Sequence, residues 1–589
     1  MEAMPNSHPH GVAMRADPVT TSHSEPSMDA TAAQTQSPRF TSRVTGRAAG
    51  LAATLLALHV SASAPAFAQT AESFATPNTG PTVLPMGTVR GERYNRLVIR
   101  GATIISGRGA PGSNRGMPPE GPVDIIIENN RIVDIVLMDA VNTAGHGRSA
   151  QRPTGDKVID ATGKYVIPGL VEMHAHLPSP SSDLGPRGLD FAYRLYLGHG
   201  ITTVRDAGTG AGLGLLGRQR AQSNSNEVVA PRLILCQRWP LPLRRWNVGD
   251  TPDKARVMVR QFKELGADCI KVSKSPGHFP DVLAAITDEG KKLGMFTMVD
   301  LKVSESDAVV ASNAGVRSIE HWYGVPDAAL KGSQNFPADY NYWDELDRFR
   351  YAGLLWSEAD RNPEKLSEVI DLLIRNGTNW NPTMTVYEDN RDVWRHLTMP
   401  ARETLVHPSE IAAGPDSTVH GAFKREWKTS DEINWKRNFQ IWMKWVREFH
   451  QRGGLLTAGS DEGGIGGIAL IRELELLQEA GIHPIDVIKV ATTNAYQALG
   501  MDTHCGIRVG CAADMAVING NPIDNFKVMY GRGYGLYGLV PRGDQWKHGG
   551  VAWTIKDGVL FDAQALLREA EWYVAQEKAR LGGKPVSVR

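Results

Sequence analysis

The stretch VIPGLVEMHAH, residues 166–176, is the part of the chain that decides its fold class. It opens with Pro168-Gly169, continues as an apolar, β-branched run and ends in two histidines, His174 and His176. Residues i and i+2 of a strand point to the same face. We therefore expect both imidazoles on one side of a strand end, where two of them would make half of a metal site.

Further apolar, β-rich runs follow this stretch, with helical patterns between them. The strand candidates are 169–173, 202–205, 233–236, 269–272, 296–299, 318–320, 379–386 and 455–457. Strands that alternate with helices form a parallel sheet, and eight such repeats form a (β/α)8 barrel. The sequence therefore predicts an α/β protein with a TIM-type barrel, whose active face lies at the carboxyl ends of the strands.

The barrel candidates are flanked by other β-rich segments. Residues 96–105 and 123–136 alternate apolar with polar side chains, and residues 551–561 repeat this style far downstream. We expect a small β-sandwich domain built from both flanks. The expected organisation is a leader with a signal peptide over 1–68, the sandwich over 93–167 and 498–562, the barrel over 168–497, and a C-terminal helix and tail over 563–589.

Residues 39–68 have the pattern of a secretory signal peptide. Arginines at positions 39, 43 and 47 precede an apolar run over 48–64, and Ala66-Phe67-Ala68 supplies a cleavage motif. The run is short for a membrane span, which would be the alternative interpretation. We expect cleavage after Ala68 and an exported chain, periplasmic or secreted, with no membrane span in its mature form.

The composition excludes several function classes. The 64 Lys and Arg residues balance 64 Asp and Glu residues, so the chain has no basic field with which to hold nucleic acid. Four cysteines without a CxxC spacing make neither a disulfide scaffold nor a cysteine metal site. In an oxidising compartment Cys505 and Cys511 could pair, which the sequence leaves open. A homo-oligomer is compatible with the sequence, which leaves the oligomeric state open too.

Taken in combination, the strand ends resemble those of the amidohydrolase superfamily. The similar segments are 166–176, 200–208, 266–271, 314–321, 459–461, 491–495 and 510–514. Cys511 stands where this family commonly has a lysine. The most similar subgroup is the imidazolonepropionase-like and Xaa-Pro-dipeptidase-like amidohydrolases. The resemblance implies a metal-dependent hydrolase built on the barrel.

The resemblance also implies a role for each strand-end residue. His174, His176 and Asp461 would bind a first metal, a carboxylated Lys271 would bridge two metals, and His321 would bind the second. The expected cofactor is one or two divalent ions, with zinc as the expected metal. Metal-bound hydroxide would attack the substrate carbon. Asp461 would act as general base and then acid, and His321 would ligate or would hydrogen-bond the substrate oxygen.

The fifth strand lacks the histidine that the resemblance leads one to expect. No histidine occurs between His278 and His321. Counting forward from the start of the strand places Asp300 at this position, and counting back from the sixth segment places Leu301 there. We prefer Asp300 because a carboxylate can bind a dication. Three interpretations remain: a two-metal site with Asp300, a site with one firmly held metal, and a degraded barrel that only binds ligands.

Substrate specificity is expected from the loops that follow the strands. In the loop 237–246, Arg238 could clamp a carboxylate and Trp239 could form an apolar wall, although a packed surface loop is an equal alternative. Tyr387, after the strand candidate 379–386, is a third candidate contact. The predicted function is hydrolysis of amide-like C–N bonds in a dipeptide, an N-acyl amino acid or a cyclic amide. A lactonase or esterase and a ligand-binding barrel are the alternatives.

Overall fold

A computed structural model describes most of the chain between residues 82 and 582. The described residues are 82–111, 113–138, 152–208, 210–240, 249–302, 305–330, 345–392, 401–413, 428–462, 465–531, 534–535 and 547–582. They belong to one unit of the chain, Ala66–Arg589. The predicted leader and signal peptide lie outside the described residues.

A parallel barrel surrounds the candidate site. Its strands are β7 (Leu170–Ala175), β8 (Ile201–Asp206), β9 (Arg232–Trp239), β10 (Cys269–Val272), β11 (Phe296–Val299), β12 (Ser318–Glu320) and β13 (Asn379–Asn381). Each strand pairs with the next one in chain order. The ring is completed by the segment 455–459, in which Leu456 bridges Trp380 and Ala458 accepts from the N–H of Met173. The eighth predicted strand is thus a short bridge, and the TIM-type barrel is confirmed.

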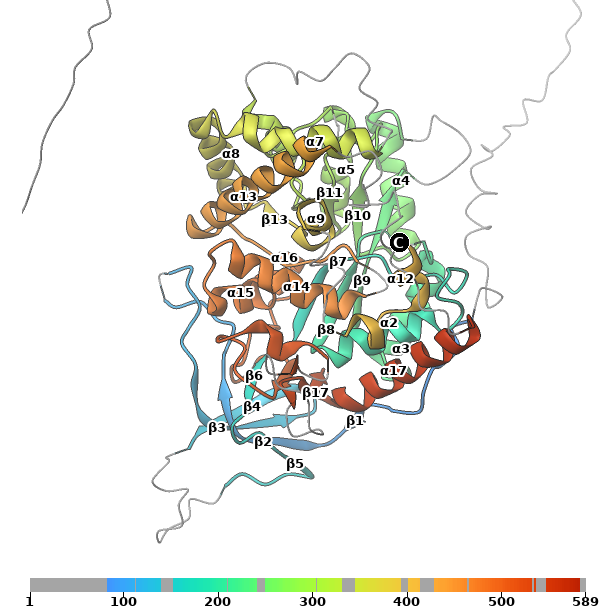
Figure 1. Ribbon diagram of the computed structural model, residues 1–589, viewed down its shortest axis with the longest axis vertical. Coiled ribbons are helices and arrows are strands. Elements are labelled where there is room, and N and C mark those ends of the chain that lie inside the picture. Colours follow the sequence, from blue (N-terminus) through green and yellow to red (C-terminus); the bar gives the residue numbers. More distant parts are fainter. Residues whose placement is uncertain are drawn as a thin grey trace, which may run out of the picture. The chain divides into compact units, whose positions relative to one another are not determined.

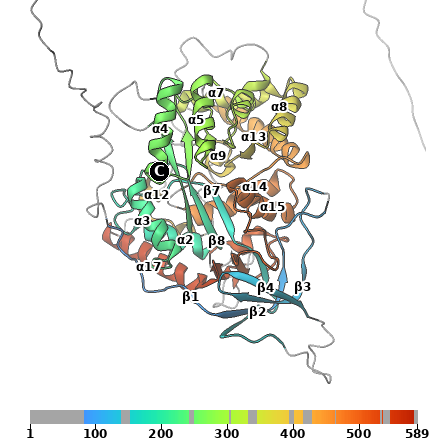
Figure 2. The same ribbon diagram turned by 180° about the vertical axis from the view of Figure 1, so that it is seen from behind.

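Helices cover the outside of the barrel (Figures 1 and 2). The helices of the described residues are α2 (Gly188–Gly198), α3 (Leu213–Asn224), α4 (Pro252–Glu264), α5 (Pro280–Lys292), α6 (Ala308–Asn313), η2 (Asp327–Ala329), α7 (Glu345–Ala359), α8 (Pro363–Arg375), α9 (Met384–Arg391), α11 (Arg402–Leu405), α12 (Pro408–Ala413), α13 (Thr429–Gln451), α14 (Gly466–Glu479), α15 (Pro484–Val490), α16 (Thr493–Leu499), η3 (Phe526–Met529) and α17 (Ala563–Arg580). In α8, for example, Leu366, Val369, Ile370 and Leu373 are buried at helical spacing. Among the described residues, no helix combines the length and apolar character needed to cross a bilayer.

One strand is shorter than the sequence predicts. The sequence predicts a strand over residues 379–386, but β13 ends at Asn381 and α9 begins at Met384. Pro382 has no N–H for the strand ladder, and Thr383 adopts a left-handed backbone with φ 51°. The N–H groups of Met384 and Thr385 donate instead to a buried glutamate on α14, Glu473, at 3.0 and 2.8 Å. Tyr387 therefore lies within a helix.

Strands from both flanks of the barrel form a nine-stranded sheet, in the order β1-β18-β17-β14-β6-β2-β3-β4 with β5 beside β2. Their bounds are Glu92–Arg93, Val559–Asp562, Val551–Lys556, Met515–Ile518, Tyr165–Pro168, Arg96–Ile104, Glu120–Glu128 and Arg131–Leu137 in that order, with Lys157–Asp160 for β5; β15 (Tyr534–Gly535) and β16 (Lys547–His548) form a separate pair. β14 is antiparallel to both β6 and β17, which joins the two flanks. The predicted β-domain from both ends of the chain is confirmed.

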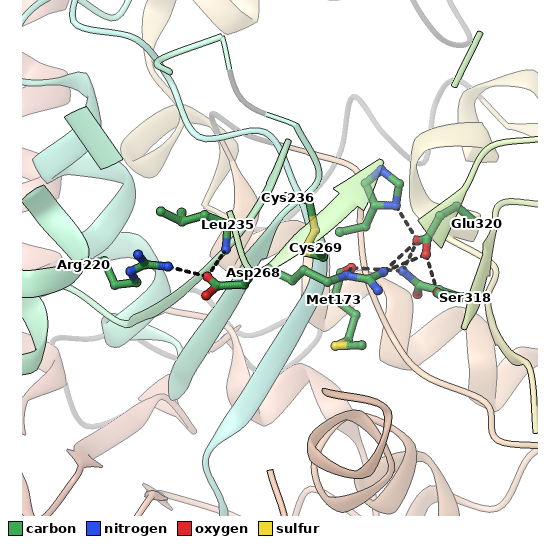
Figure 3. Close-up of a disulfide and its surroundings, with 11 residues drawn as sticks. Met173, Arg220, Leu235, Cys236, Asp268, Cys269, Ser318 and Glu320 are labelled. Carbon is green, nitrogen blue, oxygen red and sulfur yellow. Dashed lines mark hydrogen bonds and ion pairs between the residues drawn. A yellow bond between two sulfur atoms is a disulfide. The ribbon is translucent and has the colours of Figure 1, made fainter. Parts of the chain in front are cut away.

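Two disulfides link the four cysteines. Cys505 pairs with Cys511, and Cys236 pairs with Cys269 across β9 and β10 (Figure 3). In the register of these strands Cys236 lies opposite Cys269, two positions before the strand-end residue Lys271. Cys236 and Cys269 therefore share the face of Lys271 and form a layer beneath it. The sequence left the first pairing open and did not predict the second.

Candidate metal centre

Three side chains meet at the carboxyl end of the barrel: His174, His176 and Asp461. The distance from Asp461 Oδ1 to His176 Nε2 is 3.0 Å, and to His174 Nε2 it is 3.3 Å. The histidines come from the end of β7, and Asp461 follows the segment 455–459. The main chain ties these two places together, because the Asp461 N–H donates to the His174 carbonyl at 2.8 Å.

The spacing of these atoms fits a small dication. At metal–ligand distances of about 2.0–2.1 Å, the ligands of a tetrahedral ion lie roughly 3.3 Å apart. Within the described part of the chain, the buried Oδ1 of Asp461 accepts no hydrogen bond of normal geometry, whereas buried polar atoms are normally satisfied. A cation between the three side chains would satisfy it. Two imidazoles and a carboxylate are a donor set that suits zinc and similar ions.

His174 is fully buried and is held from behind by Glu320. The distance from His174 Nδ1 to Glu320 Oε2 is 2.7 Å. Burial, together with the charge of Lys271, lowers the pKa of His174 to about 4, so the ring is neutral at physiological pH. A neutral ring that donates from Nδ1 to the carboxylate presents its Nε2 lone pair to Asp461.

Glu320 is a residue that sequence reasoning missed. Arg205 Nη2 donates to its two oxygens at 2.8 and 2.9 Å, and Asn381 donates to Oε2 at 2.8 Å (Figure 3). Burial alone would raise the pKa of Glu320, but the Arg205 charge holds this pKa well below its usual range. The signal available in the sequence was an acidic residue at the end of a buried strand, directly before His321.

Lys271 lies at the end of β10, and its side chain is buried. Its Nζ is 3.2 Å from His174 Nε2, beside the three-ligand group. Burial lowers the pKa of Lys271 to about 8, against the opposing attraction of nearby carboxylates such as Asp300. A larger fraction of Lys271 is therefore present as the neutral amine than in an exposed lysine. The neutral amine is the form that reacts with carbon dioxide.

His321 completes the arrangement on the opposite side of Asp461, with Nε2 at 3.8 Å from Asp461 Oδ2. Its Nδ1 is 2.6 Å from Thr383 Oγ1, and that hydroxyl donates to the Pro382 carbonyl at 2.7 Å. Since the hydroxyl proton is used there, Nδ1 of His321 must carry a proton and donate. Burial lowers the pKa of His321 well below its usual value. Its Nε2 therefore faces the site as a lone pair, whereas donation to a substrate oxygen, as the sequence allowed, would require the other tautomer.

Asp300, at the position of the missing histidine, already has a cationic partner. Lys302 Nζ lies 3.0 Å from Asp300 Oδ2, and His321 Nε2 lies 3.9 Å from the same oxygen. Burial raises the pKa of Asp300, but Lys302, His321 and Lys271 together hold this pKa well below its usual range. The carboxylate is thus ionised and paired without a second metal, which favours the interpretation with one firmly held ion.

His321 and Asp461 share an uncommon backbone conformation, with φ 65° and 61°. The left-handed region is rare for residues other than glycine. Main-chain bonds fix both residues, because the N–H of His321 donates to the Asn381 carbonyl and that of Asp461 to the His174 carbonyl, each at 2.8 Å. Such conformations persist where the surrounding structure imposes them, and they concentrate at functional sites.

The three predicted substrate contacts have different surroundings. Arg238 lies on β9, not in a loop; it is exposed, and in the strand register it is opposite Lys271. Trp239 is fully buried and packs edge to face on Phe262 of α4, with ring centroids 5.8 Å apart. The prediction of Trp239 as a pocket wall is wrong, because strand alternation turns it away from the barrel interior. The Tyr387 ring is buried, 5.7 Å from the His321 ring.

Residues 443–559, a stretch that includes Asp461, match the family model described as the amidohydrolase family. The chain is 36% identical over 86 residues to an adenine deaminase of Geobacillus kaustophilus (strain HTA426), which is 14% of each protein. It is 31% identical over 84 residues to a dihydroorotase of Trichlorobacter lovleyi (strain ATCC BAA-1151 / DSM 17278 / SZ), 14% of this chain and 15% of that protein. The matched segments thus span only a small part of these curated relatives.

Solved structures share the fold over most of the chain. A Xaa-Pro dipeptidase with bound methionine in its active site aligns with 79% of this chain and 100% of its own, at 20% identity and a TM-score of 0.51. The bottromycin amidohydrolase aligns with 86% of this chain and 96% of its own, at 17% identity and a TM-score of 0.52. Ochratoxinase of A. niger aligns with 80% of this chain and 96% of its own, at 16% identity and a TM-score of 0.51.

Proposed function

We propose that this chain, a member of the amidohydrolase superfamily, is a metal-dependent hydrolase that cleaves amide-type C–N bonds. The observation that carries this proposal is the convergence of His174, His176 and Asp461 at the carboxyl end of the barrel, within 4.8 Å of one another through their ligand atoms. The family match over the stretch that contains Asp461 supports the same assignment. Zinc is the proposed ion, since imidazole and carboxylate ligands suit it.

A bound dication would acidify a water molecule and polarise the substrate carbonyl. Asp461 is ionised, because the surrounding imidazoles outweigh its burial and hold its pKa well below the usual value. Its Oδ2, on the side of His321, would take the proton of the attacking water and pass it to the leaving nitrogen. Thr383 would keep His321 in the tautomer that presents its Nε2 lone pair to the site.

We propose that Lys271 is carboxylated in the active protein. As an ammonium group, it would place a positive charge 3.2 Å from His174 Nε2, where it would repel a dication. Carboxylation replaces this charge with oxygen ligands directed at the same place. The modification is detectable as a mass increase of the intact chain and as a carbamate signal in carbon NMR after labelling with ¹³C-bicarbonate.

The proposed substrates are small amides with a carboxylate, such as a dipeptide or an N-acyl amino acid. Arg238 supports this proposal, because it is exposed and opposite Lys271 in the strand register. A guanidinium group binds a carboxylate in a bidentate manner. The scissile carbonyl would then lie between this anchor and the three metal ligands.

We propose further that the protein is exported. The basic, apolar and AxA segments within residues 39–68 support this proposal. The two disulfides support it as well, since such bonds form and persist in oxidising compartments.

The test is hydrolysis by the purified full chain after loading with zinc. The panel contains dipeptides and N-acyl amino acids. For each of them it also contains an ester analogue and an amide analogue, both without the carboxylate. We expect turnover of the carboxylate-bearing amides, and we expect Arg238→Ala to raise their KM while leaving the neutral amides unchanged. Turnover of esters alone would favour the lactonase or esterase alternative, and the absence of any turnover with a loaded metal would refute the hydrolase.

A further inference from the structure

A polar cavity of about 550 Å³ lies at the end of the barrel opposite to the metal centre. It is lined by residues 113–115 of the β2–β3 connection, by the last turns of α13, and by residues 481–483 and Asp486. The segment 455–459 completes the barrel and runs from one of its ends to the other. α13 ends just before this segment, beside the cavity, and Asp461 follows the segment. The cavity and the metal centre therefore lie at opposite ends of the barrel. Its volume is in the range of small-molecule sites. We call it the basal cavity.

Two arginines, Arg115 and Arg447, line the basal cavity. Among the described residues, neither guanidinium group has an ion-pair partner. Arg452, which directly follows α13, does have one, since it pairs with Asp371 at 3.2 Å. The Arg447 side chain lies across Gly481, where an added Cβ would come within 3.1 Å of its Cδ. A glycine at this position thus leaves space for the arginine at the cavity wall.

His450 is a buried lining residue with an unsatisfied nitrogen. Its exposure is 4%, and within the described part of the chain its Nδ1 has no hydrogen-bond partner. Buried polar atoms without a partner are uncommon and call for a ligand, a water molecule or an ion. His483, also in the lining, accepts the Ile485 N–H at 3.3 Å through Nδ1, so its Nε2 carries the proton as a donor.

Asp486 is the carboxylate of the described lining, and its oxygens are already engaged. Oδ1 accepts the Gly116 N–H at 2.6 Å, and Oδ2 is 3.6 Å from His450 Nε2. Asn114 donates to the His450 carbonyl at 2.6 Å. The β2–β3 connection runs beside α15 (Figures 1 and 2), and these contacts fasten it to the barrel there. The cavity therefore has a built frame, with two arginine cations against one occupied carboxylate.

We propose that the basal cavity binds a small organic anion, whose phosphate or carboxylate group is held by Arg115, Arg447 and the imidazole of His450. Guanidinium groups match the planar, bidentate geometry of both kinds of oxyanion. The site lies outside the metal centre, and none of its residues takes part in the proposed hydrolysis. It is therefore a second ligand site of this protein.

The experiment is isothermal titration of the full chain with inorganic phosphate and, separately, with succinate. We expect Arg447→Gln and Arg115→Gln each to weaken binding at least tenfold. The matched control is Arg452→Gln, which removes a charge from the same end of α13 but is not part of the lining. Asp461→Asn is titrated in parallel and is expected to bind as the unaltered chain does, which excludes binding at the metal centre.

The proposal is overturned if neither probe binds at millimolar concentration, if Asp461→Asn removes the binding, or if Arg452→Gln weakens it as much as Arg447→Gln. The stronger of the two probes identifies the anionic group. If an arginine variant folds poorly, the melting temperature of Asp461→Asn with and without each probe provides the answer. A rise then supports the site, and no change contradicts it.

Discussion

His174 and Glu320 are joined by a hydrogen bond of 2.7 Å between two fully buried side chains. The two partners come from opposite parts of the barrel ring, β7 and β12. The bond orients the imidazole and selects its tautomer. The orientation of one proposed metal ligand is thus set by a residue outside the group of His174, His176 and Asp461.

Glu320→Gln is expected to weaken metal binding about 10- to 100-fold, the range found for such supporting partners. The amide can still accept from Arg205, but its NH₂ group would face the His174 Nδ1–H, so the ring would change tautomer and lose its Nε2 lone pair. Metal affinity by competition with a chromogenic chelator is the measurement. Glu320→Asp is the control that retains the charge. Equal affinity of the glutamine variant and the unaltered chain would contradict this role.

Purified protein is expected to hold close to one firmly bound metal per chain, because Lys302 already neutralises Asp300. Asp300→Ala should leave the metal content unchanged, whereas Lys302→Ala should increase it by freeing the carboxylate. Elemental analysis after dialysis checks both. Two metals in the unaltered chain, reduced to one in Asp300→Ala, would show instead that Asp300 replaces the missing histidine.

Asp461→Asn is expected to lower kcat by about 10²–10⁴-fold, the usual contribution of a general acid–base group. Its metal content should be compared at the same time, because Asp461 is also a proposed ligand. The measurement is made at saturating zinc, so that lost binding and lost proton transfer can be separated. A variant that is fully loaded and fully active would rule out the proton-transfer role.

Acid is expected to destabilise the metal-free protein through two buried histidines, His174 and His199. Burial lowers the pKa of each to about 4, below the value of about 6.5 in the unfolded chain. Their contribution is therefore present above pH 6.5 and is lost as the pH falls towards 4. One group amounts to about 3 kcal/mol, at about 1.4 kcal/mol per pKa unit.

The free energy of unfolding in urea, measured at pH 7 and at pH 4.5, checks this expectation. His199 directly follows α2 and is not part of the metal centre. His199→Gln should therefore reduce the difference between the two values. A difference that stays the same in this variant would show that His199 is not responsible.

The barrel and the positions of its polar strand ends could be predicted because they depend on local pattern. His174, His176 and Lys271 directly end apolar runs, where the carboxyl ends of parallel strands meet. The role of Glu320 could not be predicted, since it depends on Arg205, which lies 115 residues away in the sequence. The prediction for Trp239 is wrong for a different reason. It treats residues 237–246 as a loop, whereas Arg238 and Trp239 are neighbours in strand β9 and therefore point to opposite faces.

The pairing of Lys302 with Asp300 is a further feature that spacing does not reveal. Sequence alone left the number of metals open, because an aspartate at a ligand position is compatible with binding and with loss of binding. Only the distance between the two side chains favours one metal over two. The basal cavity is hidden from sequence in the same way, since its lining comes from three distant segments.

The nine-stranded sheet pairs strands that are synthesised early with strands that are synthesised late. β6 ends at Pro168, and its partner β14 begins at Met515. The barrel strands are synthesised between them. Until β14 is synthesised, the hydrogen-bonding edge of β6 that pairs with it stays unpaired. Unpaired edges of this kind invite association with other chains. Growth of the nascent chain should therefore pass through an aggregation-prone stage, which chaperones would have to cover until the last strands close the sheet.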